Sequence, residues 1–195
     1  MARASRIKVT ASLQKQLEDN INFDEINYFV RRDGEGESKF FPEWENEISE
    51  EKLISIKSKN LILDTSGNKN LVHFPRKHAI RIKPIIKSLF PNRMIKTSGF
   101  FYYPKTGYMG WHTNCNTASD TLYLTYSTGV SFFRYYDGEK VVTDYDDCGF
   151  TIRKFEIRAQ KPYFWHCVGS DCDRFSFGFR LLGGCEEGSL ETPPS

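Results

Sequence analysis

The chain of 195 residues is about the size of one domain and is long enough to bury its own core. Its 27 basic and 25 acidic residues leave a net charge of +2, which is too balanced to indicate by itself a nucleic-acid-binding or membrane-binding protein. No stretch approaches the roughly 18 apolar residues of a membrane span, no signal segment follows the basic start, and an odd count of 5 cysteines indicates reduced thiols, so we expect a cytoplasmic protein.

Helical patterns dominate the first part of the chain. Apolar residues at helical spacing predict a short helix over residues 10–23 and a charged helix from Glu43 to Lys57. The same spacing predicts an amphipathic helix between Lys77 and Phe90, although Pro84 could instead mark its start. We therefore expect a helical region over about residues 1–96.

Several basic residues fall close together in and before the last of these helices. They are Arg76, Lys77, Arg81, Lys83 and Lys87. A local basic patch is one interpretation, and a solvated helix face is the simpler one, because charge runs on helices usually face water.

The character of the chain changes after residue 97. Short runs rich in aromatic and β-branched residues alternate with turn signals, which is typical of an all-β barrel or sandwich. The predicted strands lie near 98–104, 108–113, 120–127, 130–136, 140–145, 149–157, 162–168 and 173–182. Asp137-Gly138 predicts a hairpin turn. We expect one domain over residues 1–182, with helices outside a barrel of residues 97–182, and a disordered tail over residues 183–195.

Two histidines lie within the predicted strands. His112 sits in the aromatic run that ends at Asn114, and side chains two apart on a strand point to the same face. His166 lies much later, between Trp165 and Cys167, again among large apolar residues. Burying an imidazole without partners costs free energy, and one metal ion can be the partner of two buried histidines. Each histidine alone is more often structural.

The strand predicted near the C-terminus has two different faces. Phe175, Phe177 and Phe179 alternate with the polar or small residues Arg174, Ser176, Gly178 and Arg180. If the apolar face packs on the helices, the cationic face points into the barrel. A buried arginine there requires an anion, and a carboxylate is its best geometric match. A metal site beside such an arginine suits a 2-oxoacid.

Together these residues resemble the Fe(II)- and 2-oxoglutarate-dependent oxygenases, in particular their prolyl-hydroxylase-like branch. The family has Tyr-Pro, Thr-Gly-Tyr and His-x-Asp where this chain has Tyr103-Pro104, Thr106-Gly107-Tyr108 and His112-Thr113-Asn114. His166 and Arg174 follow at the spacings of the family's distal histidine and arginine. Arg174-Phe175-Ser176 is similar to its Arg-x-Ser pair. The resemblance covers about residues 98–182.

The resemblance implies an α+β, mainly β fold: a double-stranded β-helix, the jelly-roll barrel of the cupin type, flanked by N-terminal helices. It also implies that His112 and His166 bind Fe(II). Arg174 and Ser176 would bind the distal carboxylate of 2-oxoglutarate, and Tyr103 would hydrogen-bond this co-substrate. We expect Trp111 and Trp165 to shape the substrate cleft. Arg180 lies too far along the strand to share Arg174's carboxylate, so a structural or substrate role fits it better.

Asn114 departs from the family, which has a carboxylate ligand at this position. Asn114 could bind the metal through its amide oxygen, or Asp120 could reach in from the next strand. The site could also have lost its chemistry, or it could hold an open position for a halide. A carboxylate suits a hard cation partly because it cancels charge, so this substitution decides how the site works.

The sequence thus predicts a dioxygenase that hydroxylates a C–H bond with release of succinate and carbon dioxide. O2 and 2-oxoglutarate would be its co-substrates. We expect a protein side chain or a nucleobase as the substrate. The alternative from another class is a catalytically degenerate barrel that acts as a binding module. Asn114 favours that alternative, whereas the retention of His112, His166, Arg174 and Tyr103 favours the enzyme.

Overall fold

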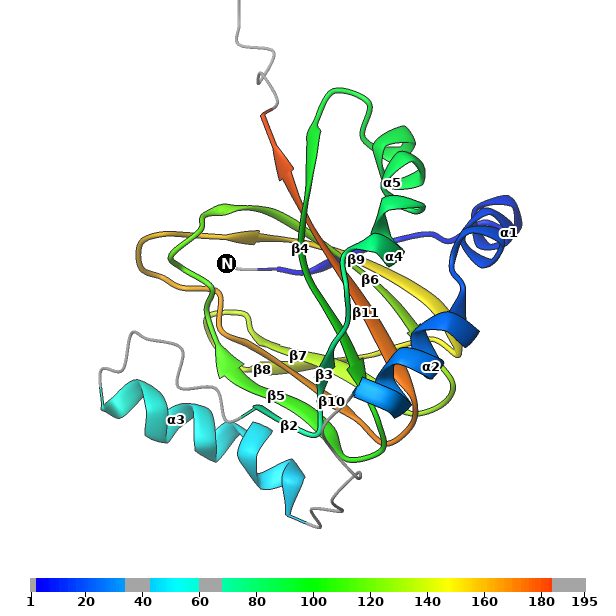
Figure 1. Cartoon of the computed structure of the whole chain (residues 1–195). Helices are drawn as coiled ribbons and strands as arrows, with labels where there is room; N and C mark the ends of the chain where they lie inside the picture. Colours follow the sequence, from blue (N-terminus) through cyan, green and yellow to red (C-terminus); the bar gives the residue numbers. More distant parts are fainter. Residues whose placement is uncertain (1–2, 34–42, 60–67, 184–195) are drawn as a thin grey trace, which may run out of the picture.

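Two antiparallel sheets form the centre of the protein. A computed structural model describes residues 3–33, 43–59 and 68–183 (Figure 1). The major sheet has the strand order β1 (Ser5–Ile7), β9 (Gly149–Ile157), β6 (Ser119–Ser127), β11 (Arg174–Leu182), β4 (Met94–Tyr103) and β3 (Val72–His73). The minor sheet has the order β2 (Asn68–Lys69), β5 (Gly107–His112), β10 (His166–Ser170), β7 (Ser131–Tyr136) and β8 (Val141–Tyr145).

The strand order is that of a jelly roll. Following the chain from β4 to β11, the strands pass back and forth between the sheets, with only the β7–β8 hairpin remaining in one sheet. Four strands of each sheet therefore face each other as a double-stranded β-helix, the architecture of the cupin class. The predicted fold class is confirmed by this topology. Asp137 accepts hydrogen bonds from the backbone N–H groups of Glu139 and Lys140 in the predicted hairpin turn.

The helices occupy two places (Figure 1). Four of them lie on the side of the major sheet: α1 (Ala11–Asn20), α2 (Phe23–Asp33), α4 (Lys77–Ile80) and α5 (Lys83–Leu89). The 3-10 helix η1 (Trp44–Ile48) and α3 (Glu50–Ser58) lie beside the minor sheet. The described residues contain no helix that is long and apolar enough to cross a membrane.

Two of the predicted helices are each divided into two shorter helices. Ser49 accepts a hydrogen bond from the Lys52 N–H and caps α3, so the helix expected over Glu43–Lys57 becomes η1 and α3. Pro84 occupies the first turn of α5, as the alternative interpretation of that proline predicted. The sequence analysis missed α2 and the short strands β1, β2 and β3. Strand β10 begins at His166, later than the predicted start at residue 162.

The largest core lies between the major sheet and the helices. Phe175, Phe177 and Phe179 all belong to it, with Leu17 of α1 and Ile86 of α5. The prediction that the apolar face of β11 packs on the helices is confirmed. The polar face of β11 must then point between the two sheets, because side chains alternate along a strand.

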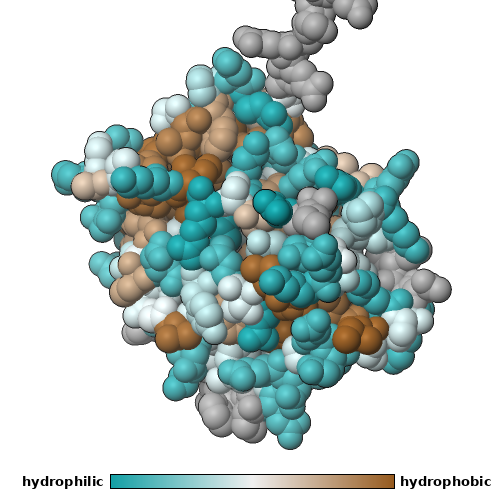
Figure 2. All heavy atoms as spheres, turned by 180° about the vertical axis from the view of Figure 1, so that it is seen from behind, coloured by the Kyte–Doolittle hydropathy of each residue, from teal (hydrophilic) through white to brown (hydrophobic). Residues whose placement is uncertain are grey.

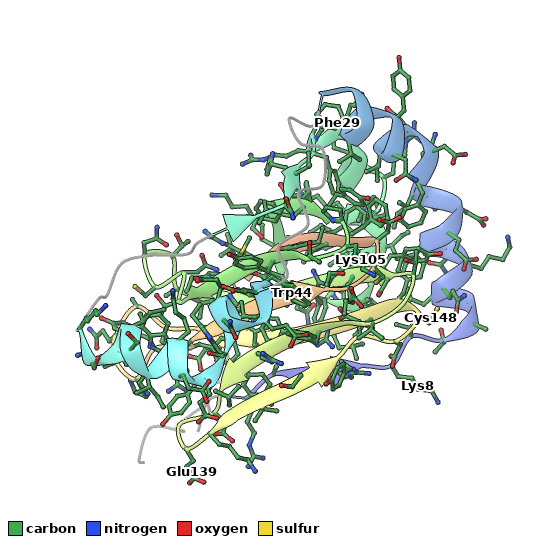
Figure 3. The ribbon with its side chains drawn as sticks, turned by 90° about the horizontal axis from the view of Figure 1, so that it is seen from below. Lys8, Phe29, Trp44, Lys105, Glu139 and Cys148 are labelled. Carbon is green, nitrogen blue, oxygen red and sulfur yellow. The ribbon has the colours of Figure 1, made fainter. Side chains whose placement is uncertain are left out.

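A second core covers the outer face of the minor sheet. Trp44 of η1 stacks on Phe132 of β7, with ring centroids 6.0 Å apart, and Ile48 is fully buried beside it. Figure 3 shows Trp44 beneath the ribbon of η1. Each sheet thus has a core on its outer face.

Hydrophilic side chains cover much of the face shown in Figure 2, with apolar areas between them. Among the described residues, the large apolar side chains that are exposed are Tyr28, Ile54, Ile80, Met94, Val130 and Tyr145. They come from different elements, and apolar side chains that are exposed singly in this way are common on protein surfaces. Apart from Gly183, the predicted tail lies outside the described residues.

We expect Leu17→Ala to lower the free energy of unfolding by about 2–5 kcal/mol, because Leu17 is fully buried between α1 and the sheet. Ile54 on α3 is 60% exposed, and Ile54→Ala should change stability by less than about 0.5 kcal/mol. Urea unfolding of the two variants measures the difference. Equal losses would show that α1 does not cover the core as described.

Candidate active site between the two sheets

The two predicted histidines lie side by side on neighbouring strands. His112 of β5 pairs directly with His166 of β10, and the centroids of the two rings are 4.1 Å apart. The pairing contains a β-bulge, because one more residue of β5 than of β10 lies between the pairs His166–His112 and Val168–Met109. This extra residue reverses the alternation, so that both Met109 and His112 face the interior while Trp111 faces outward.

Backbone carbonyls select the same tautomer in both rings. Nδ1 of His112 lies 2.7 Å from the carbonyl oxygen of Gly110, and Nδ1 of His166 lies 3.0 Å from that of Phe164. Each Nδ1 therefore carries the proton and donates it to the carbonyl. In both rings Nε2 is then the nitrogen with a lone pair, which is the arrangement that metal-binding histidines use.

Asn114 completes this cluster. Its Nδ2 lies 3.4 Å from Nε2 of His166, to which it donates a long hydrogen bond. Strand β5 ends at His112, and Asn114 has a left-handed backbone with φ 53°, a conformation that asparagine tolerates better than most residues. The expected proximity of His112 and Asn114 is therefore present, but a turn produces it rather than strand alternation.

His166 is enclosed by aromatic rings. The ring centroids of Phe133, Phe155 and Phe164 lie 5.4–5.5 Å from that of His166, which is fully buried. Burial lowers the pKa of His166 well below its usual value, and the neighbouring His112 lowers it further. His166 is therefore a neutral imidazole at physiological pH, as a metal ligand requires.

A cavity of about 420 Å³ opens beside His112 and Asn114. Its walls come from β4, β5, β6, β9 and β11 and from the residue before α4. The lining residues are Arg76, Lys96, Thr97, Ser98, Gly99, Phe101, Met109, His112, Asn114, Thr117, Thr121, Tyr123, Ile157 and Arg180. Its volume is within the range of about 300–1,000 Å³ that is usual for small-molecule sites.

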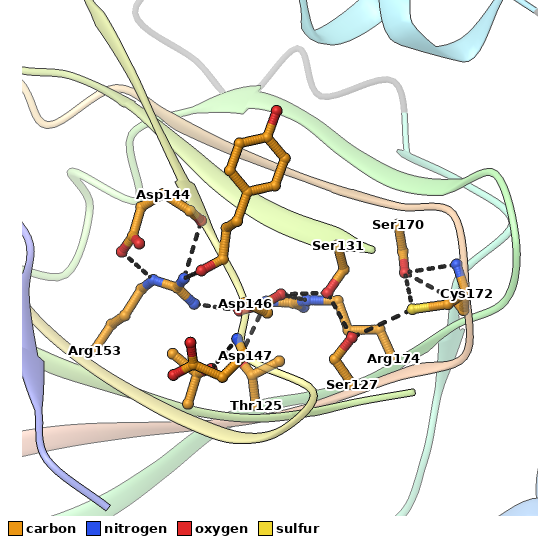
Figure 4. A network of polar contacts seen from close by, with 12 residues as sticks. Thr125, Ser127, Ser131, Asp144, Asp146, Asp147, Arg153, Ser170, Cys172 and Arg174 are labelled. Atoms are coloured by element: carbon orange, nitrogen blue, oxygen red, sulfur yellow. Dashed lines mark hydrogen bonds and ion pairs between the residues drawn. The ribbon is translucent and has the colours of Figure 1, made fainter. Parts of the chain in front are cut away.

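Arg174 lies deep between the sheets and is fully buried, as predicted, but its carboxylate partner is part of the protein. Nε of Arg174 is 2.9 Å from Oδ2 of Asp146, and Nη2 donates to the hydroxyl of Thr125 at 3.1 Å. Asp146 also binds the buried guanidinium of Arg153, which pairs in turn with Asp144. Figure 4 shows Asp146 between the two arginines.

This network holds Asp146 in its charged form. Burial alone would raise the pKa of Asp146, but Arg174 and Arg153 together with the hydroxyl of Ser131 lower it to about 2.

One hydrogen-bond donor of this network has no acceptor among the described residues. Nη1 of Arg174 is buried and has no hydrogen-bond partner among the described residues. Such a donor is costly to leave unpaired, so it marks a place for a further acceptor.

The other two predicted co-substrate residues accompany Arg174. Tyr103 of β4 pairs directly with Arg174, and its ring centroid is 5.0 Å from the guanidinium carbon. Ser176 is buried on the same face of β11. Burial raises the pKa of Tyr103 and Arg174 opposes that rise, so the phenol remains protonated. None of these three residues lines the cavity at His112.

Trp111 and Trp165 do not shape the cleft, and this prediction was wrong. Both belong to the outer core of the minor sheet, and the Trp111 indole N–H donates to the Ser49 carbonyl oxygen at 2.8 Å. The reason is alternation: each tryptophan precedes an inward-facing histidine, so it points to the opposite face.

Asp120 does not reach the histidines. It lies on β6 next to Thr121, which faces the cavity, so the Asp120 side chain points the other way. Its carboxylate binds Arg93 at 2.8 Å and Lys154 at 3.4 Å. Within the described ranges, no three His, Cys, Asp or Glu side chains could surround one metal ion. Asn114, and not Asp120, lies beside His166.

The sequence analysis missed several cavity residues. Tyr123 of β6 faces the interior, and burial raises its pKa to about 12 although Arg174 and Arg180 oppose the rise. The alternation of hydroxyl residues with leucines over 121–125 could have identified this face of β6. Arg76 was grouped with the solvated helix face, yet it reaches the cavity, and Lys96 is on β4. Nothing in the local sequence distinguishes these two cations from others.

Solved structures that match this chain include two of low sequence identity. A Pseudomonas putida prolyl-4-hydroxylase matches with a TM-score of 0.42 and 10% identity, over 94% of this chain and 95% of that one. A Trichoplax adhaerens prolyl hydroxylase, in complex with a hypoxia inducible factor oxygen degradation domain peptide fragment, matches with a TM-score of 0.41 and 13% identity, over 90% and 94%. No family model and no curated protein matches the sequence. The chain is thus similar in structure to prolyl hydroxylases over nearly its whole length.

We expect Asp146→Asn to lower the free energy of unfolding by about 3–5 kcal/mol at pH 7, because it leaves two buried guanidinium groups with a neutral partner. The pKa of Asp146 is depressed in the folded protein, so its contribution is fully present above about pH 4 and is lost as pH falls towards 2. Urea unfolding from pH 7 to pH 2.5 should show the wild type and the variant converging. A difference that stays constant with pH would contradict the ionised Asp146.

Proposed function

We propose that this protein is a non-haem Fe(II) dioxygenase that uses 2-oxoglutarate and hydroxylates a C–H bond. The observation that carries the proposal is the His112–His166 pair, with both rings held in the metal-binding tautomer beside a cavity and in the same barrel as a buried arginine. In both rings the backbone carbonyl leaves the Nε2 lone pair available to a metal ion.

The donor set fits a divalent metal ion. His112 and His166 would each supply Nε2, and Asn114 would supply its amide oxygen after a half-turn of the amide group. Such a turn exchanges Nδ2, now 3.4 Å from His166, for Oδ1. Two imidazoles and an amide oxygen form a neutral set, which binds iron more weakly than the two-histidine, one-carboxylate set common in this chemistry.

The buried arginine fits an oxoacid in part. Nη1 of Arg174 is the unpaired donor that a carboxylate oxygen would accept from, and the protonated phenol of Tyr103 lies next to it. Asp146 already neutralises much of the charge of Arg174. The carboxylate of 2-oxoglutarate would therefore share this arginine with Asp146, and we expect weaker binding than at an arginine without such a partner.

When bound, iron and the oxoacid supply the activation of O2 and the oxidation of the substrate. The chain's own residues provide the surroundings. Phe133, Phe155 and Phe164 exclude water from His166 and keep it neutral. Tyr123 lines the cavity with its proton retained, so it can donate a hydrogen bond to a bound molecule. A substrate in the cavity would lie against His112 and Asn114.

A binding module is the second candidate, and two observations favour it. Asn114 brings no charge to the metal position, and Asp146 holds the arginine on which the co-substrate depends. A barrel with these two features could bind a small molecule without catalysis. Metal affinity separates the two candidates, because only the enzyme requires it.

We expect the wild-type protein to bind one Fe(II) or Co(II) ion without oxygen, detected by calorimetry and by the visible spectrum of Co(II). His112→Ala and His166→Ala should each lose at least about a hundredfold in affinity, or about 2.7 kcal/mol. His73 is exposed on β3, and His73→Ala should bind as the wild type does. Asn114→Asp should bind at least about tenfold more tightly, because it adds a negative charge. A wild type without affinity for either metal would leave the binding module as the better description.

We expect Arg174→Gln, tested in the presence of iron, to abolish 2-oxoglutarate binding and the succinate that forms on admitting air. Since this change also leaves Asp146 buried without its partner, the matched variant is Arg174→Gln with Asp146→Asn, which removes both charges. Loss of oxoacid binding in both variants, with metal binding retained, supports the assignment. Retained oxoacid binding in the double variant would show that Arg174 is only structural.

A further inference from the structure

We propose that the cavity beside His112 takes a small phosphate ester, with its phosphate group held by Arg180, Lys96 and Arg76. This assignment rests on the proposed function, since it names the substrate class of the same site, but the binding itself needs neither iron nor 2-oxoglutarate.

The walls of the cavity carry uncompensated positive charge. Arg76, Lys96 and Arg180 line it, and no aspartate or glutamate is among its lining residues. None of the three forms a salt bridge or a side-chain hydrogen bond within the part of the chain that the structure describes. By contrast, Arg6, Arg93, Arg153 and Arg174 each pair with an aspartate. A concave surface with three such cations concentrates anions.

The register of the major sheet places two of these cations directly opposite each other. Arg180 of β11 pairs with Lys96 of β4 on one side and with Thr121 of β6 on the other, and all three line the cavity. Directly opposed side chains on neighbouring strands are only about 4.5–5.5 Å apart, and like charges in such pairs destabilise a sheet. An anion between Lys96 and Arg180 would convert this repulsion into a binding site.

A phosphate group matches this wall better than a carboxylate does. It carries up to two negative charges and presents three strong acceptor oxygens, so it can use several separate donors at once. Ser98 and Thr117 also line the cavity, and their hydroxyl groups are additional neutral donors. Ser98 and Gly99 form a bulge opposite Gly178, where a Cβ at Gly178 would lie 2.4 Å from the Ser98 hydroxyl, so the strands approach closely at this wall.

Apolar and aromatic side chains also line the cavity. Phe101, Met109 and Ile157 are among them, and Tyr123 adds a ring with a protonated phenol. The volume of about 420 Å³ suits an organic group of modest size rather than a folded partner. A phosphate at the cations would hold such a group between the cationic wall and the metal position at His112 and Asn114.

The test is isothermal calorimetry on the metal-free protein at low salt, with adenosine 5′-monophosphate, adenosine and inorganic phosphate as probes. We expect the monophosphate to bind at least about tenfold more tightly than either adenosine or phosphate alone, because it uses both the cations and the apolar side chains of the cavity. Arg180→Gln and Lys96→Gln should each lower the affinity for the monophosphate by about tenfold or more. Lys105 pairs with Asp171 away from the cavity, and Lys105→Gln should bind as the wild type does.

Three results would overturn the assignment. The first is adenosine binding as tightly as its monophosphate, and the second is wild-type affinity for the monophosphate in both cavity variants. The third is measured with iron present: Arg180→Gln lowers the affinity for 2-oxoglutarate, while Arg174→Gln with Asp146→Asn does not. The cavity cations would then hold the co-substrate instead of a phosphate ester. Because the monophosphate is titrated without metal, a protein that fails to bind iron can still support the phosphate site.

Discussion

The alternation of side chains along the barrel strands is the constraint on which this structure depends. Helices cover the outer face of the major sheet, and η1 with α3 covers the outer face of the minor sheet, so each strand must send apolar groups outward. The inner face is then available for other chemistry. On β11 the alternation places three phenylalanines in the core and Arg174 and Arg180 in the interior. A one-residue slip would exchange the two faces and remove the site.

Bulges adjust this alternation where the site requires it. Without the bulge in β5, His112 would share the outward face of Tyr108, and the histidine pair could not form. The bulge in β4 brings Ser98 and Gly99 to the cavity wall opposite Gly178. Both irregularities lie at residues that line the cavity or flank its histidine, which is where bulges commonly serve to direct side chains.

The interior holds two cationic regions of different character. At one end, Arg174 and Arg153 share Asp146, and the buried pairs fix the loop after β8 against the barrel. At the other end, Arg180 and Lys96 line the cavity, and no described aspartate or glutamate lines it with them. The Cα atoms of the two arginines are six residues apart, roughly 20 Å along an extended strand, so a single carboxylate group cannot contact both. The positive charge of the first region is largely neutralised by aspartates of the protein, whereas that of the second would be neutralised by a bound ligand.

The sequence by itself determined the strands of the barrel and the opposite faces of β11, because alternation and turn residues are local signals. For His112 and His166 it only suggested a shared metal site, because residues far apart in the chain pair through the register of β5 and β10. The expectation for Trp111 and Trp165 was wrong because it did not apply this alternation: each tryptophan neighbours an inward-facing histidine and so points outward. The sequence also could not show that Asp146 neutralises Arg174, because that contact joins a loop after β8 to the start of β11. Only the tertiary structure brought Arg76, Lys96 and Arg180 to one cavity, since residues from three separate elements become neighbours through the register of the sheet and the packing of α4.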